Sequence, residues 1–177
     1  MSYLNRNVWV LMIAGALGLC IAPVVVFIGG IVGAELAPRP ELATLPVAAI
    51  VIGTAFAVIP VSRLMQFFGR KRVFLLAAIF SALASLGAAF AIYIQSFIGF
   101  NFAVALLGTG LAVIQQYRFA AMESVSQEYL PNTASFILLG GLVSAILGPE
   151  LAHLGKDLFE ASFVGSFALL AVTCLLG

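Results

Sequence analysis

The sequence predicts an all-α integral membrane protein built from six hydrophobic helices. Hydrophobic residues make up 63% of the chain and charged residues only 8%, whereas a soluble domain usually carries about 25% charged residues. The mean hydropathy is +1.20. The few charges lie in short segments that separate long apolar runs, so most of the surface is matched to lipid.

The charged segments divide the chain into spans, because a helix needs about 20 residues to cross the hydrocarbon core. Residues 73–117 carry no charge, and as one helix they would reach roughly 67 Å at 1.5 Å per residue, which is over twice the core thickness. The chain must therefore reverse once within them, at the polar and turn-tolerant residues between Gln95 and Asn101. The predicted spans are 8–34, 42–62, 73–94, 100–120, 133–153 and 161–177.

We treat residues 1–177 as a single transmembrane domain. The last predicted span is still apolar at Gly177, whereas a final span usually carries a polar or basic flank at the interface. This ending predicts a chain cut at its sixth helix, and a natural six-helix protein with a blunt terminus is the alternative.

The placement of Lys and Arg predicts the orientation, since basic residues are retained on the cytoplasmic side. With a cytoplasmic N-terminus, only Arg39 and Lys156 fall outside. Most acidic residues fall outside as well, although they contribute little to the rule. The predicted cytoplasmic basic residues are Arg6, Arg63, Arg70, Lys71, Arg72 and Arg118, and the outer acids are Glu35, Glu41, Asp157 and Glu160.

Several function classes are disfavoured. The formal net charge of +1 gives no reason to expect a nucleic-acid partner. Cys20 and Cys174 lie in apolar runs and are predicted to pack, not to form a disulfide or metal site. No nucleotide-binding motif appears, and no cofactor is predicted. A single histidine, His153, without a Gly-x-Ser-x-Gly motif argues against an intramembrane protease.

The connection between the second and third spans carries the most specific motif. It runs from Ser62 to Arg72 as SRLMQFFGRKR, and it resembles the signature that the major facilitator superfamily carries in this loop. Gly69, Arg70 and Lys71 fit the pattern, while Gln66 stands where the family has Asp. The resemblance implies a gating loop that holds the two halves of a transporter together, and a purely topological anchor is the alternative.

The fifth span resembles the glycine-rich motif of exporters in the same family. Its core is Gly148-Pro149, within a segment that has small residues at 140, 141, 144, 148 and 152. Proline removes a backbone donor, and small residues allow close helix contact. Such a helix suits a rocking interface between halves, and an ordinary packing stripe is the alternative.

Polar residues inside predicted spans supply the candidate sites. Gln115, Gln116 and Arg118 lie in span four, which in the family lines the central cavity, so they are candidates to face substrate. Alternatively, Arg118 extends to the headgroups or pairs with Glu123. Glu150 and His153 are candidate proton carriers in span five, and hydration at the outer interface is the competing interpretation.

The resemblance implies the N-terminal half of a twelve-span secondary transporter, built of two inverted three-helix repeats. Its implied partners are the lipid bilayer, a small-molecule substrate and a C-terminal six-helix half. The exporter-like motif points to proton-coupled efflux by an antiporter in a bacterial inner membrane, although the Arg that many family members carry near the position of Val104 is absent. The alternative is a six-span channel or structural membrane protein acting as a homodimer.

Overall fold

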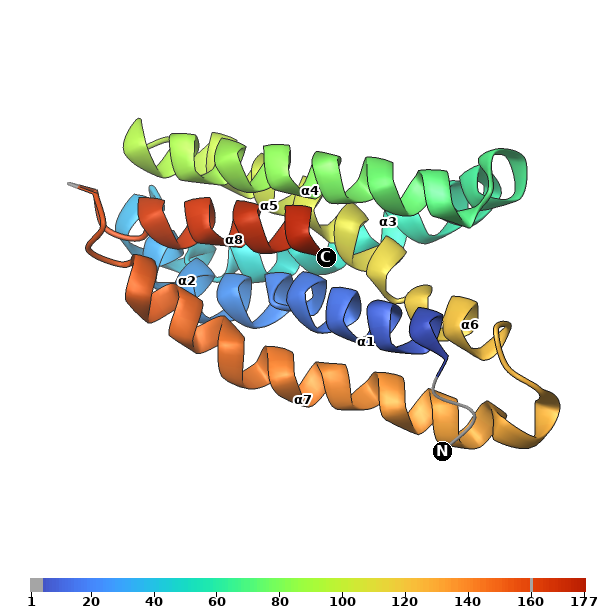
Figure 1. Cartoon of the computed structure of the whole chain (residues 1–177). Coiled ribbons are helices and arrows are strands. Elements are labelled where there is room, and N and C mark those ends of the chain that lie inside the picture. The colour runs from blue at the N-terminus through green and yellow to red at the C-terminus, as the bar shows by residue number, and fades with distance from the viewer. Residues whose placement is uncertain (1–4, 160) are drawn as a thin grey trace.

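The structure is a computed structural model that describes residues 5–159 and 161–177. Glu160, which the sequence places in an outer loop, falls outside the described residues. Over the described part of the chain the regular structure is helical, and the helices lie side by side in one bundle (Figure 1). The helices are α1 (Arg6–Leu19), α2 (Ile21–Leu36), α3 (Leu45–Phe68), α4 (Arg70–Tyr93), α5 (Phe97–Ile114), α6 (Tyr117–Met122), α7 (Leu130–Gly155) and α8 (Val164–Leu176), with short 3-10 turns at Pro40–Leu42 and Gln127–Tyr129.

Five helical segments are long and apolar enough to cross a membrane, counted over the described residues. They are Arg6–Leu36, Pro40–Phe68, Arg70–Tyr93, Phe97–Met122 and Gln127–Gly155. The sixth candidate, α8, has 13 residues and extends only to about the middle of the bundle (Figure 1). A full crossing takes about 20 residues, so the count of six spans stays a prediction.

Helix boundaries differ from the predicted spans where local hydrogen bonding favours a longer helix. α3 continues past Arg63 to Phe68 and ends at Gly69, whose φ of 78° needs a glycine. α5 begins at Phe97 because Ser96 accepts a bond from the Gly99 N–H at 3.2 Å. Two turn-tolerant residues, Gly99 and Asn101, therefore lie inside a helix and not in the predicted reversal.

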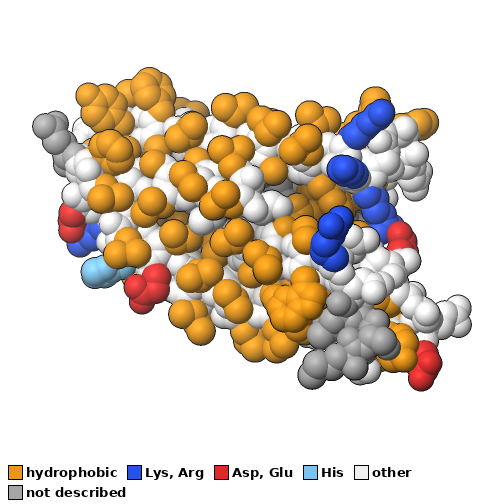
Figure 2. All heavy atoms as spheres, in the orientation of Figure 1, with side chains coloured by type: hydrophobic (Ala, Val, Ile, Leu, Met, Phe, Trp, Pro, Cys, Tyr) orange, Lys and Arg blue, Asp and Glu red, His pale blue; other side chains and the backbone are white. Residues whose placement is uncertain are grey.

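The bundle exposes many large apolar side chains. Leu75, Leu83 and Phe90 on α4 are each more than 60% exposed, which would be costly in water but is expected against lipid. Figure 2 shows hydrophobic side chains across the middle of the molecule and charged side chains at its two ends. The protein is an all-α membrane protein.

The interior is held by close helix contacts and by hydroxyl groups bonded to backbone. The Ser85 hydroxyl on α4 donates to the Phe167 carbonyl on α8 at 2.7 Å, and the Ser166 hydroxyl donates to the Ala152 carbonyl on α7 at 2.7 Å. Both serines are fully buried. In lipid such hydroxyl bonds add modestly to packing while satisfying every buried polar group involved.

Three of the closest helix pairs follow the pattern of an inverted repeat. Counting α1 with α2 as the first span and α5 with α6 as the fourth, the first packs on the fifth (α7), the second (α3) on the fourth, and the third (α4) on the sixth (α8). Exchanging spans one to three with spans four to six leaves these three pairs unchanged. The close pair of the third and fourth spans, α4 with α5, has only a weaker counterpart between the sixth span and the first. Equivalent spans run in opposite directions through the bundle (Figure 1), as two inverted three-helix repeats require.

The two ends of the bundle differ in charge. One end, called here the basic end, holds the α3–α4 turn, α6, the α6–α7 connection and the start of α1 (Figure 1). Lys and Arg side chains gather at this end, as Figure 2 shows. The opposite end holds the α2–α3, α4–α5 and α7–α8 connections with Arg39 and Lys156.

Candidate functional site

The fourth span is interrupted between α5 and α6, at Gln115 and Gln116. The Gln116 N–H donates to the Val113 carbonyl, three residues back, at 2.9 Å, instead of to the carbonyl four residues back as in a regular α-helix. The helical register tightens here and then resumes at Tyr117. Such tight turns inside helices often mark functional hinges.

The first span is interrupted as well, at Cys20 between α1 and α2. Pro23 has no N–H to donate to the Leu19 carbonyl, four residues earlier. Next to this missing bond the helix tightens, because the Cys20 N–H donates to the Leu17 carbonyl, three residues back, at 3.3 Å. The first and fourth spans are equivalent in the predicted inverted repeat. Each tightens locally at one point, while its backbone stays in the right-handed helical region.

The two interruptions flank one cavity of about 170 Å³, called here the central cavity. Gln115 and Arg118 contribute its polar side chains at one wall together with Tyr117, and their own side chains are exposed. The remaining lining is apolar or glycine. The lining residues are Gly15 and Leu19 of α1, Ile114, Gln115, Tyr117 and Arg118 around the α5–α6 break, and Ile137, Leu138 and Gly141 of α7.

Of the three substrate candidates, the structure brings Gln115 and Arg118 together in this cavity and leaves Gln116 out of its lining. Gln115 also lines a second cavity of about 380 Å³ between α2, α3 and α5, where Thr54 is the other polar side chain. Gln115 therefore separates two cavities. The guanidinium carbon of Arg118 lies 4.7 Å from the centre of the Phe119 ring.

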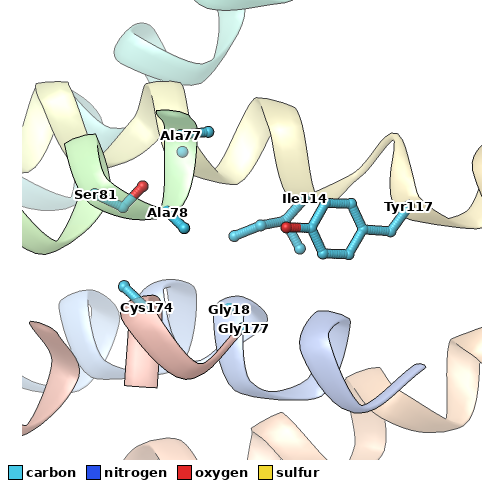
Figure 3. Close-up of a pocket in the computed structure, with 9 residues that line it drawn as sticks. Gly18, Ala77, Ala78, Ser81, Ile114, Tyr117, Cys174 and Gly177 are labelled. Carbon is cyan, nitrogen blue, oxygen red and sulfur yellow. The ribbon is translucent and has the colours of Figure 1, made fainter. Parts of the chain in front are cut away.

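Tyr117 is a cavity residue that the sequence analysis did not single out. It is 5% exposed, and its ring centre lies 4.5 Å from that of Phe74. Its hydroxyl points into a separate cavity of about 10 Å³ beside Ser81 and Cys174 (Figure 3). An aromatic residue next to a pair of glutamines in a cavity-lining span is the sequence feature that could have identified it.

The predicted gating loop forms a specific ion pair. The Arg70 Nη2 donates to the Glu123 Oε1 at 2.6 Å, which joins the α3–α4 turn to the end of α6. This pair replaces the Arg118–Glu123 pair that was one alternative from the sequence. Gly69 makes the turn with φ 78°, and Lys71 is exposed in the first turn of α4.

The small residues of α7 face the first span. A Cβ atom at Gly148 would overlap Pro23 of α2, and one at Gly140 would meet the Met12 carbonyl oxygen of α1 at 3.0 Å. Ser144 lies between them and is buried. Pro149 is half-buried beside Gly148, so the Gly148-Pro149 motif sits where α7 packs on the interrupted span.

Glu150 and His153 lie in the last turns of α7, toward the end opposite the basic end. Both side chains are exposed. Neither lines the central cavity nor the second cavity. Their geometry matches hydrated positions near an interface, and their predicted role in proton coupling receives no support from a buried or paired environment.

The chain is similar to transporters of known sequence. It is 38% identical to the riboflavin transporter RfnT of Brucella anthropi over 97% of this chain and 44% of that protein. It is 24% identical to the uncharacterised MFS-type transporter YdeG of Bacillus subtilis, over 99% of this chain and 42% of that protein. A second Bacillus subtilis MFS-type transporter, YddS, is 23% identical over 71% of this chain.

No protein-family model and no solved structure gives a significant match. The chain spans less than half the length of the curated relatives it matches. All three relatives are named transporters and not enzymes. Two of these relatives are named MFS-type transporters, and together with the apolar helices and the α3–α4 turn this similarity shows that the chain belongs to the major facilitator superfamily.

Proposed function

We propose that this chain is the N-terminal half of a secondary active transporter that moves a small molecule by alternating access. The central cavity carries the proposal, because it lies between the interrupted first and fourth spans. Binding sites of secondary transporters form at broken helices that line a cavity at the interface of inverted repeats. A second six-helix half would close the cavity from the other side, and rocking of the halves would expose it alternately.

We further propose riboflavin as the first substrate to test. The relative that is 38% identical is named a riboflavin transporter. The central cavity and the second cavity offer apolar walls for a planar ring system, and Gln115 and Arg118 offer an amide and a guanidinium for its polar edge. Gln115 lines both cavities, so it is the residue best placed to form hydrogen bonds with the polar edge of the ring system.

The test is transport of riboflavin by the full-length protein in membrane vesicles of both orientations, prepared from cells without another riboflavin transporter. Gln115→Leu and Arg118→Gln should each lower the transport rate at least tenfold, the cost of about 1.4 kcal/mol of lost binding or orientation. Gln116→Leu, outside the cavity lining, is the matched control and should stay within twofold. A wild-type protein that moves no riboflavin, in either direction, would remove this substrate.

Direction and coupling are proposed from the sequence alone. The Gly148-Pro149 motif favours efflux, and proton antiport through Glu150 and His153 is the proposed energy source. Inside-out and right-side-out vesicles with an imposed pH gradient separate these points. Proton antiport predicts that Glu150→Gln abolishes the response to the gradient while downhill exchange persists, and an unchanged response would exclude Glu150 as the carrier.

A further inference from the structure

A strongly apolar groove, distinct from both the central cavity and the second cavity, lies between α3, α4 and α5 near the basic end. Its volume is about 400 Å³. Leu64 and Phe68 of α3 and Leu76 and Phe80 of α4 line it, and Thr109 of α5 is its one polar lining residue. It shares no lining residue with the central cavity. A groove with so little hydrogen-bonding capacity suits a hydrocarbon chain and not a polar solute.

The groove ends at the most basic segment of the chain. Its lining residues Phe68 and Val73 directly flank residues 69–72, which hold Arg70, Lys71 and Arg72. Arg72 is four residues before Leu76, so it lies one turn away on the same side of α4. Hydrophobic side chains adjoin the Lys and Arg side chains at this end (Figure 2).

The charges at this mouth are not neutralised within the described part of the chain. The ion pair of this turn joins Arg70 to Glu123. Arg72 and Lys71 are exposed, and no ion pair is recorded for either among the described residues. Two free cations at the end of an apolar groove form an amphipathic site that is complementary to a molecule with an anionic head and a hydrocarbon tail.

We propose that this groove binds an anionic phospholipid, with an acyl chain along α3 and α4 and the phosphate held by Arg72. Arginine recognises phosphate by paired, charge-assisted hydrogen bonds, and basic pockets between membrane helices bind anionic headgroups. The bound lipid contacts the α3–α4 turn through Arg72, and the Arg70–Glu123 pair connects the same turn to α6. Lipid composition thereby acts on the proposed gate.

Native mass spectrometry of the full-length protein tests this site, with phosphatidylglycerol as the probe and phosphatidylcholine as the neutral reference. Wild type should retain phosphatidylglycerol several-fold more than phosphatidylcholine. Arg72→Gln should remove that preference, and Arg72→Lys should restore part of it. Leu76→Trp, which fills the groove, should lower retention of both lipids.

The chain offers matched controls for each variant. Arg39→Gln removes the same charge at the opposite end and should leave the preference unchanged. Leu83, on the same helix and as exposed as Leu76 at 62% against 63%, lies outside the groove lining, so Leu83→Trp should have no effect. Thermal unfolding with and without phosphatidylglycerol gives a second readout, since ligand binding raises stability by mass action.

Three results would overturn the proposal. The first is equal retention of the two lipids by wild type. The second is an equal loss with Arg72→Gln and Arg39→Gln, which would mean a diffuse attraction to the basic surface. The third is unchanged lipid retention in a folded Leu76→Trp protein, which would mean that another part of the protein covers the groove.

Discussion

The Arg70–Glu123 pair joins the α3–α4 turn to the end of α6 through a single side-chain contact. Its N–O distance of 2.6 Å is short, yet Glu123 is 64% exposed and Arg70 36%. Exposed pairs usually contribute only about 0–1 kcal/mol. The second guanidinium nitrogen of Arg70, Nη1, is buried without a hydrogen-bond partner, so the pair holds the α3–α4 turn against α6 without saturating the arginine.

A double-mutant cycle with Arg70→Gln and Glu123→Gln should give a coupling energy of about 0.5–1 kcal/mol, because each single change leaves the other charge without its partner. The measurement is the free energy of unfolding in detergent micelles, repeated at high salt, where the coupling should shrink. Lys71→Gln, one residue from Arg70, is the control. A coupling energy of zero at low salt would mean that the contact is incidental.

The substrate candidates illustrate what a linear sequence can and cannot assign to single residues. Polar side chains in an apolar span mark a region at once, and Gln115, Gln116 and Arg118 were predicted together for that reason. Neighbouring residues on a helix point about 100° apart, and the break at 115–116 changes that angle. Only the folded chain separates Gln115 and Arg118, which line the cavity, from Gln116, which does not.

At the scale of elements, glycine lets α3 and α5 approach until their backbones touch. On α3, a Cβ at Gly53 would overlap the Ala105 backbone of α5, and on α5 a Cβ at Gly108 would overlap the Ile50 carbonyl and Thr54 amide of α3. Gly148 of α7 is also close to α2, but there a Cβ would overlap the Pro23 ring and not the backbone. Close packing by small residues is the main attraction between helices in lipid.

Gly108→Ala should therefore destabilise the protein by about 1–3 kcal/mol, since the new methyl group must push two backbones apart. The matched control is Gly30→Ala, where a Cβ would meet no atom within 4 Å, and where alanine gains up to about 1 kcal/mol of helix propensity. Both are measured as the midpoint of thermal unfolding. Equal midpoints for the two variants would contradict the close α3–α5 contact.

The two helix interruptions differ in how far they can be predicted from the sequence. Pro23 inside the first apolar run is a visible breaker, although the run was predicted as one span. Gln115 and Gln116 are ordinary helix formers, and nothing local requires a break there. The tight turn at this point forms in a packed setting, where Tyr117 is buried against Phe74, and tertiary packing of that kind overrides propensity.

For the whole molecule, membrane class, the order of the helices and the charged ends could be predicted because each depends on composition or on local charge placement. The pairing of spans could not, since almost every face of these helices is apolar and no amphipathic stripe says which face is inside. Leu83 and Leu107 show the difficulty: both are leucines in uncharged helices, yet one is 62% exposed and the other 0%. Shape complementarity, and not hydrophobicity, selects the buried face in lipid.

Orientation in the membrane is the whole-molecule property that the charge distribution predicts most directly. Basic residues are retained on the cytoplasmic side, so the basic end should face the cytoplasm. The probes are single cysteines at Gln66 in α3 near the α3–α4 turn and at Glu41 in the α2–α3 connection, both exposed. Both single cysteines are introduced into a protein whose native, buried Cys20 and Cys174 are replaced by alanine. In intact cells a membrane-impermeant maleimide should label Glu41→Cys at once, and should label Gln66→Cys only after the membrane is permeabilised. Because α3 joins these positions through one bilayer-spanning helix, labelling of both from the same side would contradict not only the orientation but the transmembrane course of α3 itself.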